Sequence, residues 1–124
     1  VVGYEKRQVF VIDISTIVTE YQAEIVENEE GKRFTAPFPK DVNNKVQYGL
    51  GVKVNAVYMS QYQLIPYNRV QEHFDEQMNL GISAGTIYNF NVEAYDKLAL
   101  FEAWLINRIR KEPLLHADEP GVNI

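Results

Sequence analysis

Few side chains in this sequence have the types and spacing that catalysis requires. The most suggestive is Asp118, which follows an apolar Leu114-Leu115 pair that predicts a short buried strand. A carboxylate at the end of such a strand can hold Mg²⁺ for phosphoryl-transfer chemistry. Taken by itself, the Asp-Glu-Pro-Gly stretch that begins at Asp118 is more typical of a solvated turn. The residues alone leave both interpretations of Asp118 open.

Other metal chemistry finds little support. The chain has no cysteine, which excludes disulfides and thiolate metal sites. Its two histidines, His73 and His116, lack the spacing of metal ligands. We therefore expect no zinc and no other cofactor in this chain.

A second candidate site is the polar start of a predicted helix. Ser83 is placed as the N-cap of a helix that follows another helix and a turn at Gly81. Two helices joined in this way have the outline of a helix-turn-helix, although a helical hairpin that simply packs has the same pattern. The residues that would approach DNA phosphates and base edges are Ser83, Gly85, Thr86, Tyr88 and Asn89.

Charge limits how DNA could be bound. The formal net charge is −5, and residues 48–112 carry a net charge of −1, so no broad basic surface is expected. The candidates for local phosphate contacts are Arg69, Arg108, Arg110 and Lys111, for which solvation on a helix surface is an equal alternative.

The elements that must position these residues form an α+β chain in three parts. Residues 1–45 have strand chemistry, with a strand at Gln8–Ile14 and a hairpin of Tyr21–Glu27 with Arg33–Ala36 that turns at Gly31. Residues 46–112 are predicted to form three helices, the last of them long, and residues 113–124 a single strand. The apolar positions that define the helices are Leu50, Val54, Val57 and Tyr58 over about 48–63; Val70, Phe74 and Met78 over about 67–79; and Ile87, Phe90, Ala94, Leu98, Phe101 and Leu105 from Ser83 to Arg110 or Lys111.

Length and composition limit the class of protein to which this chain can belong. The chain has 124 residues, of which 46% are hydrophobic and 23% charged, as in a globular protein. No apolar run approaches the ~20 residues that span a bilayer, so a membrane protein is not expected. The chain begins Val1-Val2-Gly3-Tyr4 without an initiator Met or a signal segment, which indicates an internal piece of a longer protein.

An ordered set of short stretches gives the sequence a family resemblance. Together the stretches resemble bacterial transposases of the insertion sequence 66 family over essentially the whole chain. They are Gly3–Phe10, Val46–Gly49, Ala56–Tyr67, Ser83–Asn89 and Leu115–Gly121. The resemblance implies a small zinc-binding β module, a helix-turn-helix that binds the element's terminal repeats, and an RNase H-like catalytic domain. Asp118 would be the first of three acids that bind Mg²⁺ for DNA cleavage and strand transfer, flanked by His116, Glu119 and Gly121.

The sequence departs from the family pattern in three places. Glu27–Lys32 stands where the family has a Cys-Pro-x-Cys-Gly knuckle, so the module is degenerate and its hairpin must hold by strand pairing and packing alone. Pro120 replaces the usual Thr of the His-Ala-Asp-Glu-Thr-Gly motif. The chain ends six residues after Asp118, before the other two acids, so we predict that it has no transposase activity by itself.

The expected function is therefore DNA binding by a truncated transposase fragment, in the bacterial cytoplasm at the nucleoid and with a homo-oligomer possible. Two alternatives stay open. One is a protein-interaction or structural module, with Tyr58, Tyr62, Tyr67 and Tyr88 lining its surface. The other is a decayed relic, which would be marginally stable.

Overall fold

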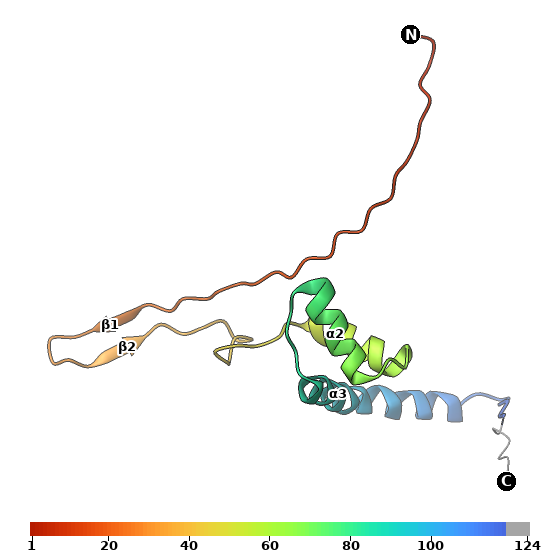
Figure 1. Cartoon of the computed structure of the whole chain (residues 1–124). Helices are drawn as coiled ribbons and strands as arrows, with labels where there is room; N and C mark the ends of the chain where they lie inside the picture. Colours follow the sequence, from red (N-terminus) through yellow and green to blue (C-terminus); the bar gives the residue numbers. More distant parts are fainter. Residues whose placement is uncertain (119–124) are drawn as a thin grey trace.

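A small hairpin precedes three packed helices (Figure 1). The computed structural model describes residues 1–118. Its elements are β1 (Ile25–Glu27), β2 (Arg33–Thr35), α1 (Leu50–Val57), the π-helix η1 (Tyr58–Tyr62), α2 (Tyr67–Met78) and α3 (Ala84–Arg110). The predicted α+β class, with a hairpin followed by three helices of which the last is long, is confirmed.

The hairpin is held by its ladder and its turn. β1 and β2 pair antiparallel, with Val26 opposite Phe34. The Asn28 side-chain oxygen accepts hydrogen bonds from the backbone N–H of Glu30, at 3.1 Å, and of Lys32, at 2.8 Å. Gly31 has the expected positive φ, +79°. The expected packing is not seen, because Val26 and Phe34 are 62% and 51% exposed.

The predicted strand at Gln8–Ile14 is wrong: residues 1–24 run as an extended arm without strand pairing (Figure 1). β-branched residues favour extended backbone, but a strand also needs a partner for its N–H and C=O groups. Within residues 1–118 the sheet contains β1 and β2 alone. The arm touches the helices where the Thr16 hydroxyl donates to the Met78 carbonyl at 2.6 Å.

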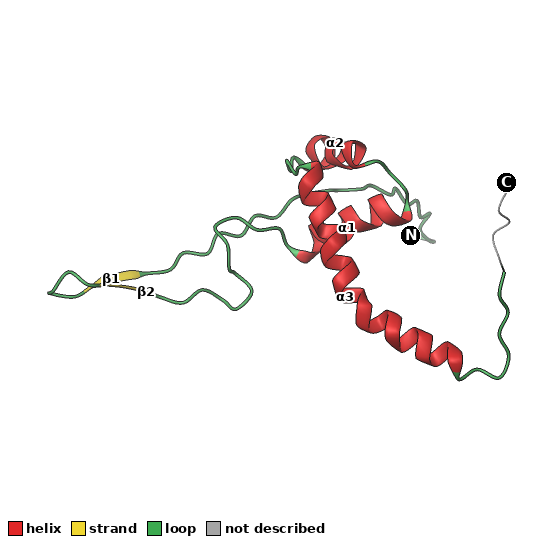
Figure 2. Cartoon of the chain, turned by 90° about the horizontal axis from the view of Figure 1, so that it is seen from below, coloured by secondary structure: helices red, strands yellow, loops and turns green. Residues whose placement is uncertain are grey.

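The core lies where α1, α2 and the first half of α3 meet (Figure 2). Its fully buried large side chains are Val70, Phe74 and Ile87, and Ala56, Ile82 and Phe90 complete it. Val70 and Phe74 lie one turn apart on α2, as the apolar spacing predicts, and Ile87 and Phe90 have the same relation on α3.

The predicted inner face of α1 is right at Val57, which packs against the core, and wrong at its other three positions. Leu50, Val54 and Tyr58 are 70%, 55% and 50% exposed, whereas Val52 and Ala56 face the core. The apolar residues of this segment go round the whole helix, so their spacing did not distinguish the buried face. The first predicted helix also changes type after Val57, since the Gln63 N–H donates to the Tyr58 carbonyl five residues back.

Helix ends follow capping chemistry, with one correction. The left-handed residue after α2 is Asn79, at φ 50° and ψ 41°, and not Gly81. Asn is the non-glycine residue that tolerates this conformation best. Ser83 caps α3 as predicted, because its hydroxyl oxygen accepts from the Thr86 N–H at 3.1 Å.

After α3 the chain continues without regular structure to Asp118. Leu114 and Leu115 are 71% and 57% exposed, so the predicted buried strand is not formed in residues 113–118. No neighbouring strand among the described residues offers them a ladder. The predictions for Glu119, Pro120 and Gly121 lie outside the described residues.

Within residues 1–118, no helix combines the length and apolar character needed to cross a membrane.

Candidate nucleic-acid interface

The start of α3 presents the polar residues that the sequence singled out. Tyr88 is 57% exposed, Gly85 and Asn89 are exposed, and Thr86 is half-buried. Ser83 holds the helix start in place through the Thr86 N–H and a 2.9 Å contact between the two hydroxyls. The structure brings all five predicted residues of this end together, on the first two turns of one helix.

The basic candidates do not join them. Arg108, Arg110 and Lys111 lie at the far end of α3, 22 residues or more after Thr86, which is about 33 Å along a helix. Arg108 and Lys111 line a shallow hollow there with Trp104, and Arg108 lies 3.9 Å from the Glu112 carboxylate. The predicted DNA-binding residues of α3 therefore form two groups at opposite ends of that helix.

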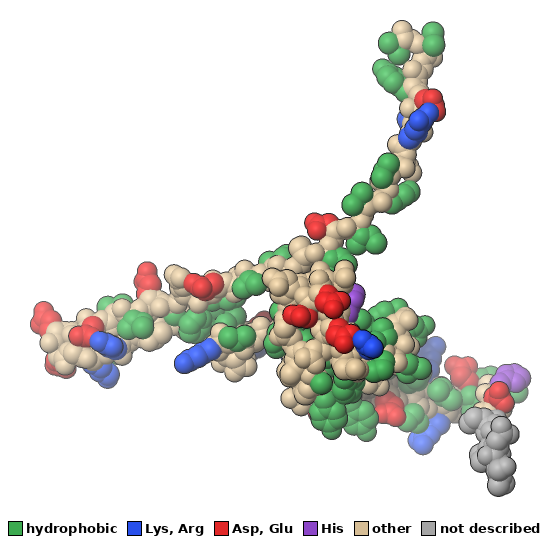
Figure 3. Space-filling model, viewed as in Figure 1, with side chains coloured by type: hydrophobic (Ala, Val, Ile, Leu, Met, Phe, Trp, Pro, Cys, Tyr) green, Lys and Arg blue, Asp and Glu red, His purple; other side chains and the backbone are tan. Residues whose placement is uncertain are grey.

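Arg69 belongs to neither group. It lies on α2, where its guanidinium donates to Glu72 at 2.6 Å. The hydrogen bond that Arg69 donates to Glu72 raises the pKa of Arg69, so the cation stays charged but is already paired. A hollow of about 550 Å³ between α2 and the start of α3 is lined by Glu72 and Asp75 beside Ser83. Acidic side chains stand out on the helical body in Figure 3. Phosphate groups would meet repulsion on this flank of the helix start.

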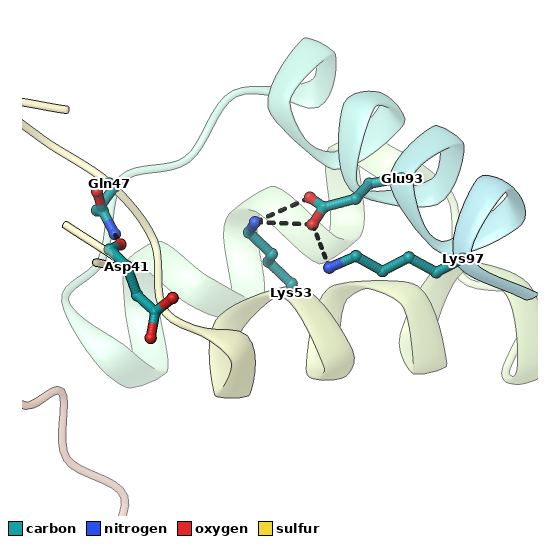
Figure 4. A network of polar contacts seen from close by, with 5 residues as sticks. All are labelled: Asp41, Gln47, Lys53, Glu93 and Lys97. Carbon is teal, nitrogen blue, oxygen red and sulfur yellow. Dashed lines mark hydrogen bonds and ion pairs between the residues drawn. The ribbon is translucent and has the colours of Figure 1, made fainter. Parts of the chain in front are cut away.

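An ion-pair network joins α3 to α1, and sequence reasoning missed it. Lys53 of α1 donates to both Glu93 oxygens, at 3.1 and 2.8 Å, and Lys97 donates to the same carboxylate at 2.7 Å (Figure 4). These hydrogen bonds, first from Lys53 and then from Lys97, lower the pKa of Glu93 to about 2. The i,i+4 spacing of Glu93 and Lys97 was visible in the sequence, but the 40-residue separation of Lys53 and Glu93 was not.

A second polar cluster joins three elements inside the body. The Asn91 amide donates to the Ser60 hydroxyl and to the Tyr67 hydroxyl, at 3.0 Å each. Ser60 is 8% exposed and donates in turn to the Ala56 carbonyl at 2.8 Å. Tyr67 is thus occupied inside the body, while Tyr58 stacks on Tyr62 at the surface. The tyrosines do not line one common surface.

Asp118 lies in an exposed, extended segment after α3, together with His116. Mg²⁺ takes six ligands in near-octahedral geometry, so one exposed carboxylate supplies only a small part of a site. Among residues 1–118, no group of three or more His, Cys, Asp or Glu side chains lies close enough to hold a metal ion. The described residues therefore do not by themselves fit a catalytic magnesium site, and we derive no catalytic step for them.

Comparison with known proteins gives the chain a family. A family model described as "Transposase IS66 family" matches residues 45–124, which is more than half of the sequence. The matched range contains the three helices and Asp118, and it excludes the arm and the hairpin. No curated protein and no solved structure gave a significant match. The chain belongs to the IS66 transposase family.

Proposed function

We propose that this chain binds DNA, with α2 and α3 as a helix-turn-helix and the start of α3 as the reading end. The observation that carries the proposal is the cluster of exposed small and polar side chains at the capped start of α3, in a chain of a transposase family. Exposed backbone N–H groups at a helix start attract phosphate, and an Asn side chain can pair with adenine in the major groove. The DNA in question is the terminal-repeat sequence of the parent element.

Asn89 gives the sharpest test. Its side chain is exposed on α3, so Asn89→Ala is not expected to change the fold. Fluorescence anisotropy should show that the variant binds terminal-repeat DNA ~1–3 kcal/mol more weakly than the parent chain, with scrambled DNA unaffected. Asn107→Ala is the matched control, since it removes the same side chain from an exposed position 18 residues further along the same helix.

Salt dependence supplies the second criterion. Phosphate contacts release counterions, so the affinity must fall as the salt concentration rises. Equal affinity for terminal-repeat and scrambled DNA, or binding that does not respond to salt, would contradict the proposal.

We further propose that Asp118 is the first acid of the family's catalytic triad and acts only beside two further acids. Two-metal phosphoryl transfer needs several carboxylates to hold both ions. The 124-residue chain should therefore leave terminal-repeat DNA uncut in Mg²⁺. Cleavage by this chain that is abolished by Asp118→Asn would show that it is a complete enzyme.

One observation favours a protein-interaction module as the second candidate. The outer face of α1 and η1 exposes Leu50, Val54, Tyr58 and Tyr62, and Lys53 is the one charged residue between Val46 and Pro66. An exposed apolar face with aromatic residues and little charge is typical of protein interfaces. Val54→Ser combined with Tyr58→Ser would abolish a protein complex on this face and would leave DNA affinity unchanged.

A further inference from the structure

The inner face of α3 continues beyond the core without a partner in the described chain. Ile87 and Phe90 are buried on this face against α1 and α2, and Ala94 is half-buried. In steps of three and four, the same face then carries Leu98, Phe101, Leu105 and Ile109, which are 56%, 55%, 39% and 43% exposed and are called the α3 stripe. In Figure 2 this half of α3 projects away from the other helices.

Charge separates the projecting half from the body. Residues 48–96 contain two cations and five carboxylates, a net charge of −3. Residues 97–112 contain four cations and two carboxylates, a net charge of +2, and three of these cations, Arg108, Arg110 and Lys111, lie at the end of the helix. The helix end of one molecule is thus complementary in charge to the body of another.

The packing of the body decides the direction of such an association. α1 and α2 already cover the inner face of α3 up to Ala94, so a second helix can lie on this face only from Leu98 onward. A parallel partner helix would bring its own α1 and α2 into the space that these helices occupy. An antiparallel partner places its body beyond Ile109, beside Arg108, Arg110 and Lys111.

We propose that two copies of this chain associate through the α3 stripe, with the two helices antiparallel and the basic end of each helix on the acidic body of the other. The pairing seats Leu98 near Ile109 of the second copy and Phe101 near its Leu105. It goes beyond the proposed DNA binding, because it uses the opposite end of α3 and needs no DNA.

The oligomeric state of the 124-residue chain tests the pairing. Sedimentation equilibrium should give a mass that rises from 14.3 kDa toward twice that value with concentration. Leu98→Glu combined with Leu105→Glu should raise the dissociation constant at least tenfold, because two carboxylates would enter each half of the interface.

Leu100→Glu is the matched control: Leu100 is 85% exposed and lies away from the stripe, so this variant should associate like the parent chain. Unchanged helical circular dichroism shows that each variant is folded. A parent chain that stays monomeric, or a double variant that still associates, would overturn the proposal.

Direction is tested by cross-linking, which the absence of native cysteines makes simple. Leu98→Cys and Ile109→Cys should each form little disulfide-linked dimer alone and should cross-link readily when mixed. Self-cross-linking of each single variant would indicate a parallel pair and would overturn the antiparallel arrangement.

A last variant separates this role of the basic end from DNA contact. Replacement of Arg108, Arg110 and Lys111 by Gln should weaken association and should leave the effect of Asn89→Ala on terminal-repeat binding unchanged. If the triple variant instead loses DNA affinity while its mass is unchanged, the basic end is a phosphate contact, and the charge argument for self-association fails. Failure of DNA binding in the parent chain, with association intact, would overturn the proposed function alone.

Discussion

The Glu93 carboxylate accepts hydrogen bonds from two lysines of the helical body. Hydrogen bonds from Lys53 and Lys97 lower its pKa from the ordinary 4.5 to about 2. The unfolded chain therefore binds a proton at Glu93 more readily than the folded one. The stabilisation is fully present above pH 4.5 and is lost as the pH falls toward 2. Because the side chain is 37% exposed, solvent screening reduces this contribution to about 1 kcal/mol.

The prediction follows for Glu93→Gln. At pH 6 the variant should be less stable than the parent chain by about 1 kcal/mol in urea unfolding, and the difference should close as the pH approaches 2. Glu102→Gln is the control on the same helix, since Glu102 forms no ion pair within residues 1–118. A difference that stays constant from pH 6 to pH 2 would mean that Glu93 acts through packing and not through its charge.

Asn91 carries a second prediction at the level of single residues. Its amide is half-buried and bridges Ser60 and Tyr67, so Asn91→Leu leaves two hydroxyls without their partner. We expect a loss of about 1–3 kcal/mol in the free energy of unfolding, and a smaller loss of about 1 kcal/mol for Tyr67→Phe. In a double-mutant cycle the two losses should be less than additive, because both variants break the same bond. Additive losses would show that the bridge is not formed.

Among the elements, the end of α2 offers a direct test of which residue makes the turn. Asn79 is left-handed, and the Phe74 carbonyl accepts from the N–H of both Asn79 and Leu80. Asn79→Gly should stabilise the chain by ~0.5–1 kcal/mol and Asn79→Ala should destabilise it by about the same amount, as read from thermal unfolding. Gly81 has no positive φ and its Cβ position is open, so Gly81→Ala should be neutral or slightly stabilising. A large loss of thermal stability for Gly81→Ala would show that Gly81, and not Asn79, makes the turn.

The elements also show how far local signals reach. Features that depend on neighbouring residues alone were found from the sequence. They are the cap at Ser83, the positive φ of Gly31, and the core pairs Val70–Phe74 and Ile87–Phe90. Of the predicted inner face of α1 only Val57 packs on the core, since contact with α3 selects Val52 and Ala56 over Leu50 and Val54. The strand at Gln8–Ile14 failed for the related reason that strand propensity does not supply a second strand.

At the scale of the whole molecule, the sequence identified the family and the polar cluster at the start of α3, but not the distribution of charge. The five predicted residues lie within the seven positions from Ser83 to Asn89, so their proximity follows from one helix. The basic residues were grouped with them by type alone, and the length of α3 separates the two groups by about 33 Å. The Lys53–Glu93 pair needs the packing angle of two helices, which no local pattern encodes.

The last prediction concerns which part of the chain unfolds as a unit. Among the residues that the structure describes, those that are buried all lie between Ala56 and Phe90, and the Thr16–Met78 hydrogen bond ties the arm to them. In the described chain, the other hydrogen bonds from residues 1–45 to the rest of the chain are local, between Gln47 and Asp41, Asn43 and Asn44. Exposed hydrogen bonds contribute about 1 kcal/mol or less each, so deletion of residues 1–45 should lower the melting temperature by less than about 8 °C and keep the transition cooperative. Phe74→Ala, which empties the centre of the core at a cost of about 3–5 kcal/mol, should depress or abolish the transition in both the full and the shortened chain. A cooperative transition in the parent chain would also argue against a decayed fold. Loss of cooperativity on deletion of the arm and hairpin alone would instead show that they are part of the folding unit, and the predicted boundary at residue 45 would be wrong.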